Sequence, residues 1–477
     1  MKKVIALILA VCMVLPFTGC GKKKQTAGGV PTLVWLMWGD KQSDNDAVMA
    51  KVNEITVPAI GAKIQIQYID QGAYSERMKM NMASGTDSYD LCFTGFINGY
   101  SSAAQKGGLL DITEYIEKMP DLKKSIPDYL WDSVTLDGKI YAVPNQQVFA
   151  NSSSVNIKKD LADEYGLDVD KIVYMEDLEP FLKWVKETHP EVYPFRTTAV
   201  IGNYKGRIEK EGVATGISVT IENGKTIAKK DIDFKDFETY PRLMSEWFKK
   251  GYIRKDVAAV MEDDQDYKAG KYAVSMTTWK PGVAQAIYAN TGYEVYSKQM
   301  TRGHLSGLIG SSTMIGVNRN SKHPEEAVKF IELINTNKDL YNLICFGIEG
   351  KHYNVVNDRV VINKEGGYAP LQAWKFGNQF NALLMEGQDD SIWEDTKKFN
   401  DEALKYDTIG FSFDNTNVRT EYAQVQKVND KYNLMNKGVE NIDEYIEGYR
   451  KEMKMAGIDK VYEELNKQLK DFQSKKG

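Results

Sequence analysis

Aromatic and polar side chains lie together where a predicted strand ends near the start of the folded chain. Residues 32–37 (TLVWLM) form an apolar, β-prone run, and Trp38, Gly39 and Asp40 follow it directly. In open α/β sheets, ligands bind beyond the carboxyl ends of the strands. An aromatic face stacks on the apolar C–H face of a sugar ring, and a carboxylate accepts hydrogen bonds from its hydroxyls. Trp38 and Asp40 are therefore the first candidate pair for a sugar-binding site.

Further candidates lie at or just beyond the ends of predicted strands, or in a glycine-containing stretch of the C-terminal half. They are Tyr74, Asn98, Tyr100, Asn145, Gln146, Trp279, Trp374 and Asn378. The chain contains 8 Trp and 27 Tyr, a generous supply of stacking surfaces for a sugar. Most Trp and Tyr side chains in a large protein pack in or near the core, so core packing is the alternative for each aromatic candidate.

Residues 347–353 (GIEGKHY) bring the polar side chains of Glu349, His352 and Tyr353 together. Two interpretations stay open for this segment. It forms a polar binding site, or it forms a turn, because Gly347 and Gly350 bracket it and glycine supplies turn conformations at no steric cost.

The opening residues predict the elements that position these side chains. Residues 63–69 alternate apolar and polar side chains and residues 89–93 are again strand-like, whereas residues 43–55 and 74–84 have helical spacing. Together with the first strand, this order reads β-α-β-α-β, which favours a parallel sheet covered by helices. The alternation continues along the chain, with expected strands at 138–144 and 272–277. Expected helices lie at 111–119, 175–188, 240–250, from Pro324, and over 442–472 with an interruption at Gly457. The sequence therefore predicts an α/β protein of two lobes.

The N-terminus has the features of a secretion signal. Lys2 and Lys3 precede an apolar run from Val4 to Phe17, which is too short to span a bilayer permanently. The following Thr18-Gly19-Cys20 resembles the lipobox of bacterial lipoproteins, which implies that Cys20 carries the lipid. The alternative is an ordinary cleaved signal with a chance cysteine. We assign residues 1–20 to a lipoprotein signal peptide and residues 21–31 to a flexible tether.

Composition excludes several classes of protein. The chain has 61 Lys+Arg against 66 Asp+Glu, and loss of Lys2 and Lys3 leaves 59 against 66, a formal charge of −7. An acidic secreted chain is a poor nucleic-acid binder, because phosphate neutralisation dominates that affinity. Beyond the signal region, only Cys92 and Cys345 remain, and we expect both to be buried free thiols. We find no zinc-ligand spacing, P-loop, G-x-G-x-x-G or G-x-S-x-G pattern, so we expect no metal and no cofactor.

Two sets of segments carry a family pattern. The first set is 74–93 (YSERMKMNMASGTDSYDLCF), 108–113 (GLLDIT), 137–144 (DGKIYAVP), 270–279 (GKYAVSMTTW) and 321–330 (SKHPEEAVKF). On these segments the chain resembles the family 1 extracellular solute-binding proteins of ABC importers, the maltose-binding-protein-like class. The second set is 347–353 and 410–414 (GFSFD), which resemble a lipoprotein subgroup with an uncharacterised C-terminal extension.

The resemblance implies a type II periplasmic-binding-protein-like fold. Each of its two lobes is a mainly parallel sheet flanked by helices, hinge strands join the lobes, and the ligand lies in the cleft between them. We assign residues 32–144 and 275–320 to the N-terminal lobe, and residues 145–274 and 321–477 to the C-terminal lobe with its helical extension. The resemblance also carries a cleft aromatic residue to the position of Trp279.

The expected function is a lipid-anchored substrate-binding protein on the outer face of a cell membrane, with a Gram-positive cell favoured. It captures a carbohydrate, expected to be an oligosaccharide, and delivers it as a monomer to the permease of an ABC transporter. We expect no enzymatic activity. The alternatives are a secreted carbohydrate-active hydrolase, a binding protein for a peptide or polyol, and an adhesin or structural lipoprotein. A hydrolase needs two carboxylates at a defined separation, and no hydrolase motif marks such a pair.

Overall fold

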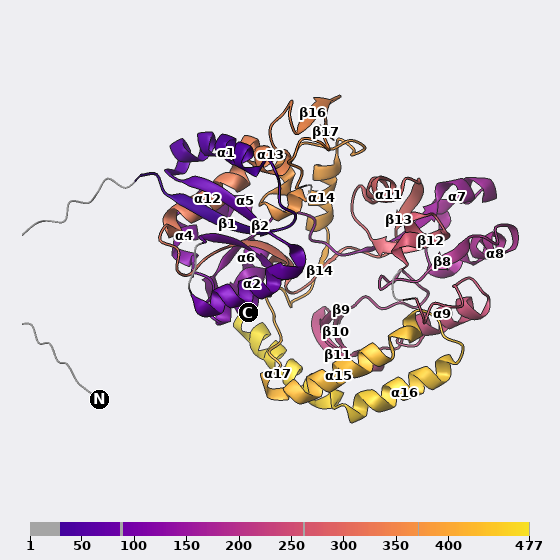
Figure 1. Cartoon of the computed structure of the whole chain (residues 1–477). Helices are drawn as coiled ribbons and strands as arrows, with labels where there is room; N and C mark the ends of the chain where they lie inside the picture. The colour runs from indigo at the N-terminus through magenta and orange to yellow at the C-terminus, as the bar shows by residue number, and fades with distance from the viewer. Residues whose placement is uncertain (1–28, 86–88, 261–262, 371, 477) are drawn as a thin grey trace, which may run out of the picture.

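The computed structural model describes residues 29–85, 89–260, 263–370 and 372–476. The predicted signal peptide, Cys20 and nearly all of the tether lie outside these described residues. Within them, helices and strands form two α/β lobes, with a pair of long helices beneath both (Figure 1). The predicted two-lobed α/β class is therefore confirmed.

The sheet of the first lobe has five strands in the order β2-β1-β3-β15-β6. These strands are β1 (Thr32–Trp38), β2 (Lys63–Ile69), β3 (Leu91–Gly95), β6 (Ala142–Pro144) and β15 (Thr313–Val317). β1 pairs in parallel with both β2 and β3, as the opening pattern predicts. β15 pairs antiparallel with β3 and β6, because it enters the sheet on the chain's return from the other lobe. The sheet is consequently mixed rather than mainly parallel.

Helices cover both faces of this first sheet (Figure 1). They are α1 (Asn45–Ile60), α2 (Gln71–Ser84), α3 (Tyr100–Gln105), α4 (Thr113–Glu117), α5 (Pro120–Ser125), α6 (Asp128–Val134), α12 (Pro324–Thr336) and α13 (Lys338–Phe346). Three short pieces complete the lobe: the hairpin β4 (Thr135–Leu136) with β5 (Lys139–Ile140), the hairpin β16 (Tyr353–Val356) with β17 (Arg359–Ile362), and α14 (Ile392–Asp401).

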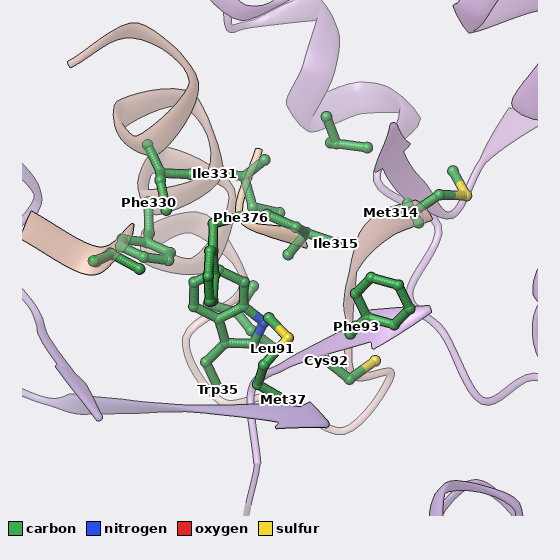
Figure 2. Packing of buried hydrophobic residues seen from close by; sticks show 14 of the residues in the cluster. Trp35, Met37, Leu91, Cys92, Phe93, Met314, Ile315, Phe330, Ile331 and Phe376 are labelled. Carbon is green, nitrogen blue, oxygen red and sulfur yellow. The ribbon is translucent and has the colours of Figure 1, made fainter. Parts of the chain in front are cut away.

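The core of the first lobe is built from aromatic and branched side chains of the sheet and of α12. The Trp35 ring lies edge-on to Phe330 and Phe376, with ring centroids 5.5 and 5.8 Å apart. Figure 2 shows these side chains together with Cys92. Within the described residues neither Cys92 nor Cys345 forms a disulfide, and both are buried, which confirms the interpretation of both as buried thiols. Burial raises the pKa of the Cys345 thiol well above its usual range.

The second lobe has a four-stranded sheet in the order β13-β7-β12-β8. Its strands are β7 (Ser153–Lys158), β8 (Tyr193–Arg196), β12 (Tyr272–Thr278) and β13 (Val295–Gln299), and its helices are α7 (Lys159–Tyr165), α8 (Glu179–Thr188), α9 (Thr239–Lys249), α10 (Asp264–Lys268) and α11 (Val283–Thr291). β12 is parallel to β8 but antiparallel to β7, and β13 is antiparallel to β7. This sheet is therefore also mixed, whereas a mainly parallel one was expected.

Two stretches of chain cross between the lobes side by side. Residues 145–152 lead from β6 to β7, and residues 300–312 lead from β13 to β15. The backbones of Asn151 and His304 exchange hydrogen bonds of 2.8 and 2.9 Å, which ties the two crossings together. A third stretch joins them where β18 (Leu404–Lys405) pairs with β14 (His304–Leu305).

These pairings correct the predicted lobe boundaries. Residues 275–299 belong to the second lobe rather than the first, because β12 pairs with β7 and β8 along its whole length. Residues 321–346 pack with the first lobe rather than the second, because Ala327, Phe330 and Ile334 of α12 are fully buried in its core. The chain returns to the first lobe after β13, whereas the prediction placed this return before β13 and sent the chain back to the second lobe at residue 321.

A third body packs beside the two lobes, and we call it the C-terminal module because its helices lie at the C-terminal end of the chain. It combines α15 (Arg419–Lys431), α16 (Ile442–Met455) and α17 (Ile458–Lys476) with a three-stranded antiparallel sheet of β9 (Glu211–Ala214), β10 (Ile217–Glu222) and β11 (Lys225–Lys230). The predicted helical stretch over 442–472 is thus two helices that meet near Gly457. Among the described residues, no helix is long and apolar enough to cross a membrane.

Candidate functional site

The carboxyl ends of β1 and β3 lie side by side in the first sheet and present aromatic side chains. Phe96 follows β3 directly, and 57% of its surface is exposed. Gly95 makes this exit possible: its φ is +135°, and a Cβ there would lie 2.2 Å from the carbonyl oxygen of Ser312. Only glycine allows the backbone of β3 to approach Ser312 this closely while turning Phe96 outward.

Four aromatic rings from three distant segments pack together at this edge, and we call them the aromatic platform. They are Trp38, Phe93, Phe96 and Trp374. The Trp38 and Trp374 ring centroids are 5.8 Å apart, and Phe96 lies 6.1 Å from Trp38 and 6.3 Å from Trp374. Trp38 and Phe93 are buried, whereas Trp374 is half-buried and Phe96 is exposed. Phe96 and Trp374 therefore form the accessible face, and the other two support it.

Hydrogen bonds from the rest of the first lobe hold the segment that carries Trp374. The Asn145 side-chain amide donates to the carbonyl oxygens of Trp374 and Lys375, at 3.2 and 2.9 Å. The Tyr341 hydroxyl donates to the carbonyl oxygen of Ala373 at 2.6 Å. Because Asn145 begins a crossing between the lobes, it links the platform directly to the hinge.

Lys375 places a cation beneath the platform. Its side chain is 2% exposed, and its ammonium lies 4.3 Å from the centre of the Trp38 ring and donates to the Trp38 carbonyl oxygen at 3.2 Å. Among the described residues, no carboxylate lies within 4.0 Å of this ammonium. Burial lowers the pKa of Lys375 to about 8, although the charge of Asp40 opposes the change. The cation–π contact and the carbonyl partly offset the cost of desolvating the ammonium.

A cavity of about 230 Å³ lies beside the platform, between the two lobes. The first lobe contributes Trp374 and residues that follow it, and the second lobe contributes residues 280–282 after β12 and one face of α11. Amides and charges that line the cavity are Gln147, Gln285, Gln379, Gln388, Lys280 and Glu386. The pKa of Lys280 lies below its ordinary value because surrounding protein limits hydration of the ammonium. Aromatic faces beside several amides and two charges suit a ligand with apolar faces and many hydroxyls.

The lobes already touch along one wall of this cavity. The Gln285 amide of α11 donates to an Asp389 carboxylate oxygen at 3.1 Å. The Trp279 ring meets Phe399 of α14 edge-on, with centroids 4.7 Å apart. α14 is therefore the element against which the second lobe rests.

Several buried polar atoms near the platform have no hydrogen-bond partner within the described residues. They are Trp38 Nε1, Asn98 Nδ2, Asn145 Oδ1 and Gln146 Nε2. Buried donors and acceptors are paired in nearly all native structures, so these four unpaired atoms indicate a polar partner from outside the chain. Hydroxyl groups, of a ligand or of water, are partners for both the donors and the acceptor.

The predicted site residues fall into two sets. Trp374 lines the cavity, Trp279 forms its edge against α14, and Asp40 is exposed just beyond β1. The others are partly or fully engaged inside the protein. Asn98 accepts hydrogen bonds from the Thr94 hydroxyl and the Gly95 amide, each at 3.1 Å.

Asn378 caps the short turn that follows the platform segment, accepting from the Phe380 amide at 3.1 Å. The backbone of Gln146 forms a bridge with that of Asn378, and the Gln146 side chain is 5% exposed. Both residues, like Asn145, shape the floor of the site from within.

Two of the predicted ligand-binding tyrosines are core residues instead. The Tyr74 hydroxyl donates to the Phe93 carbonyl oxygen at 2.7 Å, and the Tyr100 hydroxyl donates to the Val134 carbonyl oxygen at 2.6 Å. Tyr74 is fully buried and Tyr100 is 3% exposed. Burial raises the pKa of both phenols above their usual range. Each lies in the first turn of a helix that folds back over the sheet, α2 for Tyr74 and α3 for Tyr100, and its side chain points into the core.

The segment 347–353 serves as a turn. The His352 ring is fully buried, its Nδ1 accepts from the Ile348 amide at 2.8 Å, and its Nε2 lies 2.7 Å from an Asp44 carboxylate oxygen. Hydrogen bonds from Lys351 and His352 hold the pKa of Asp44 below its ordinary value. This turn therefore docks onto the start of α1 through Lys351 and His352, whereas Glu349 is exposed.

Phe96, Lys375 and Lys280 were missed by the sequence analysis. Phe96 carried a usable signal, because it follows β3 as Trp38 ends β1. Lys375 and Lys280 carried none, since only the folded chain brings them to the platform and the cavity. Among the described residues, no group of three or more His, Cys, Asp or Glu side chains is arranged to hold a metal ion.

Two stretches of the chain match known protein families. Residues 59–340 match the family of bacterial extracellular solute-binding proteins. Residues 407–474 match a domain of unknown function, DUF3502. The second match covers the helices of the C-terminal module.

Two curated proteins are similar to the chain. A carbohydrate ABC transporter substrate-binding protein of Streptococcus pneumoniae serotype 4 is 29% identical over 488 aligned positions, covering 98% of this chain and 96% of that protein. The polygalacturonan/rhamnogalacturonan-binding protein YtcQ of Bacillus subtilis is 23% identical over 398 positions, covering 76% of this chain and 75% of that protein.

Solved structures of one streptococcal protein superpose on the chain. The crystal structure of the N-glycan transport solute-binding protein NgtS of Streptococcus pneumoniae gives a TM-score of 0.83 at 27% identity, covering 94% of this chain and 100% of that chain. Its complex with Man1GlcNAc gives a TM-score of 0.71 at 26% identity, covering 93% of this chain and 100% of that chain. Its complex with Man5GlcNAc gives a TM-score of 0.66 at 28% identity, covering 94% of this chain and 99% of that chain.

Proposed function

The chain belongs to the bacterial extracellular solute-binding proteins, and from this membership we propose that it captures an oligosaccharide between its two lobes for delivery to an ABC importer. The aromatic platform beside the amide-lined cavity is the observation that carries the proposal. Phe96 and Trp374 offer stacking faces to sugar rings, and the glutamines of both lobes offer donors and acceptors to the hydroxyls. Trp279 and Asp40 complete the proposed binding set at the edges.

Lobe closure on the ligand is the proposed mode of capture. The chain superposes better on the NgtS structure of TM-score 0.83 than on the two glycan complexes of that protein, at 0.71 and 0.66. Sequence identity is nearly the same in all three comparisons, so a difference in lobe arrangement explains the trend. This supports an open form here and a closed form with ligand, related by hinge motion at the crossings.

Delivery and anchoring complete the proposal. We infer that Cys20 carries a lipid and that the tether lets the binding protein reach its permease. We also infer that the protein acts as a monomer on the outer face of the cytoplasmic membrane of a Gram-positive cell. The sequence of residues 1–31 supports this, since an apolar signal run ends at a Thr-Gly-Cys motif and a polar stretch follows.

A hydrolase is the less favoured alternative. Glycoside hydrolysis needs two carboxyl groups on opposite sides of the scissile bond. The described residues that line the cavity include one carboxylate, that of Glu386. The similar proteins named above are binding proteins, which also supports capture without reaction.

A thermal-shift screen tests the proposal. The protein is heated with mono-, di- and oligosaccharides, with peptides and polyols as controls, and the mixture is examined by mass spectrometry after long incubation. A ligand at 100 times its Kd adds about 2.7 kcal/mol of stability, a shift of a few degrees. We expect a shift with an oligosaccharide that remains chemically intact. A sugar that is consumed contradicts the binding role, and a shift with only peptides or polyols contradicts the ligand class.

A further inference from the structure

The C-terminal module has a hydrophobic core of its own. Strand β10 supplies Ile217 and Val219, and the three helices supply Val425, Met453 and Leu465, all of them buried in one cluster. These segments lie roughly 200 residues apart in the sequence, yet they pack as one body.

The β9–β11 sheet and the three helices of the module approach each other closely. A Cβ on Gly216 would lie 2.6 Å from the Met453 side chain. The Asn429 amide of α15 donates to the Thr215 hydroxyl at 2.6 Å. The β9–β11 sheet and the helices are therefore expected to move together.

The module is joined firmly to the second lobe through α9. Arg242 of α9 forms an ion pair of 2.7 Å with Asp443 of α16, and the Ser245 hydroxyl donates to the Val439 carbonyl oxygen at 2.5 Å. Gly438 lies flat on α9, because a Cβ there would come within 3.0 Å of the Phe248 side chain.

A second set of contacts reinforces this junction. Arg450 of α16 pairs with Glu238, the residue just before α9, at 3.1 Å. The β9–β11 sheet is also an insertion in the second lobe between β8 and α9. Covalent continuity, ion pairs and close packing therefore fix the module to this lobe.

The junction with the first lobe is closely packed at its centre, because a Cβ on Gly410 would lie 2.7 Å from the carbonyl oxygen of Asp132 in α6. It is made by residues 407–412 and by the last turns of α17, whose Phe472 packs on Phe411 with ring centroids 5.6 Å apart. The Gly410 amide donates to the Gly307 carbonyl oxygen at 2.7 Å.

Two cavities of about 640 and 660 Å³ open along this junction. The first is bounded by Tyr129 of α6 on one side and Gln473 of α17 on the other, and the second by Gln105 of α3 and Phe472 of α17. We call this junction, together with the two cavities that flank it, the seam.

The seam and the ligand cavity lie at opposite ends of α14. Ile392 and Thr396 at the start of α14 line the ligand cavity, whereas Lys405, just beyond its end, lines the first seam cavity. Figure 1 shows the helices of the module (orange to yellow) beneath both lobes, with the C-terminus of α17 beside the first lobe. Motion that brings the lobes together over the ligand must therefore displace the module relative to the first lobe along the seam.

We propose that the C-terminal module is a rigid extension of the second lobe and that its contact with the first lobe at the seam limits how far the cleft opens. This rests on the proposed function, because it presumes that the lobes close over a ligand. It assigns a mechanical role to the segment that matches the domain of unknown function. A fixed limit on opening keeps the ligand-free lobes near the geometry in which closure begins, which reduces the conformational cost of capture.

Distances between spin labels test the proposal. Exposed lysines give one label position on each body: Lys124 on the first lobe, Lys183 on the second lobe and Lys470 on the module. Each pair is converted to cysteine in a chain carrying Cys20→Ser, since Cys92 and Cys345 are buried. The probe is Man5GlcNAc.

We expect Man5GlcNAc to change the 124–183 and 124–470 distances and to leave the 183–470 distance unchanged. A change in the 183–470 distance as large as that between the lobes overturns the rigid extension. If the 124–183 distance does not change, the lobes do not close on this glycan. That outcome contradicts the proposed function, whereas the 183–470 distance and the variant described next test the role of the module.

A second measurement needs no ligand. Phe472→Ala removes the largest α17 side chain at the seam, and we expect the 124–183 distance in the free protein to lengthen and its distribution to broaden. Met455→Ala is the matched control, because Met455 lies on α16 with 74% of its surface exposed. An unchanged distribution in Phe472→Ala overturns the limit on opening.

Discussion

Lys375 carries an ammonium group into an aromatic environment, where it meets the Trp38 carbonyl oxygen and the rings of Trp38 and Phe376. A buried cation without a carboxylate partner is costly, and such groups concentrate at functional sites. Its neighbour Trp374 faces the cavity, so the buried charge and the stacking face belong to one short segment. Lys375 is best understood as a positioning residue for Trp38 and Trp374.

The charge of Lys375 makes a testable contribution to stability. Burial lowers its pKa to about 8 from an ordinary value of 10.5, so between these pH values the unfolded chain binds a proton that the folded chain lacks. The wild-type protein should therefore gain stability relative to Lys375→Met as pH rises from 8 to 10.5, by on the order of 3 kcal/mol, with no change below pH 8. Urea denaturation at several pH values measures this.

Lys51→Met is the control for the Lys375 experiment, because Lys51 lies on the exposed face of α1. Its stability difference from wild type should vary little over the same pH range. A difference between wild type and Lys375→Met that is independent of pH would show that the ammonium keeps an ordinary pKa.

Residue types were easier to predict than side-chain directions. The sequence analysis named Trp38 at the end of the first strand and Trp374 in a segment assigned to the second lobe, and the structure brings the two rings into contact. It also named Tyr74 and Tyr100, whose hydroxyls bond to core carbonyl oxygens. A position after a strand does not reveal whether the side chain turns outward or back over the sheet. That choice depends on tertiary packing, which one sequence does not display.

At the scale of elements, the end of β3 decides whether the platform has an accessible face. Gly95 has a φ of +135° and approaches the Ser312 backbone too closely for any Cβ. Phe96 then leaves the sheet with its amide bonded to the Ser312 carbonyl oxygen at 2.8 Å. The geometry of one glycine therefore fixes the direction of the exposed ring.

Gly95→Ala should destabilise the protein by about 2 kcal/mol or more, because it combines backbone strain with a steric clash. Gly61→Ala is the matched control: Gly61 also has a positive φ, of +73°, but nothing lies within 4 Å of a Cβ there. It should cost about 1 kcal/mol from strain alone. Guanidinium denaturation compares the two, and equal losses would mean that the close approach at Gly95 is unimportant.

Local patterns predicted the elements well wherever the period was clear. Residues 63–69 alternate and form β2, and the helix that Pro324 opens is α12. The direction of β15, β7 and β13 escaped prediction, because it depends on where the chain crosses between the lobes. Strand patterns show the period of a strand but not its partner.

At the scale of the whole molecule, the lobe boundaries were the main error. The prediction ended the first segment of the second lobe at residue 274, although β12 and β13 both belong to that lobe. Nothing in the local sequence separates a strand of one lobe from a strand of the other, since both are short apolar runs. The assignment depends on long-range pairing, and the same holds for the joining of β9–β11 to the C-terminal helices.

Closure of the lobes predicts a change in overall dimensions. Small-angle X-ray scattering of the protein with saturating oligosaccharide should show a smaller radius of gyration than the free protein, because hinge closure brings the lobes together. Man5GlcNAc is a suitable first ligand, since NgtS is similar to this chain and has a structure in complex with it. Binding without any decrease would contradict the closure mechanism while leaving capture intact.

The central claim is that an oligosaccharide binds against the aromatic platform, and isothermal titration calorimetry of Trp374→Ala tests it most directly. Trp184→Ala is the matched control, because Trp184 is a half-buried tryptophan of the second lobe that stacks on Phe181, with ring centroids 5.8 Å apart. We predict that Trp374→Ala raises the Kd about tenfold or more, whereas Trp184→Ala leaves it within a factor of about two. Equal affinity of wild type and Trp374→Ala would place the sugar elsewhere and contradict the account.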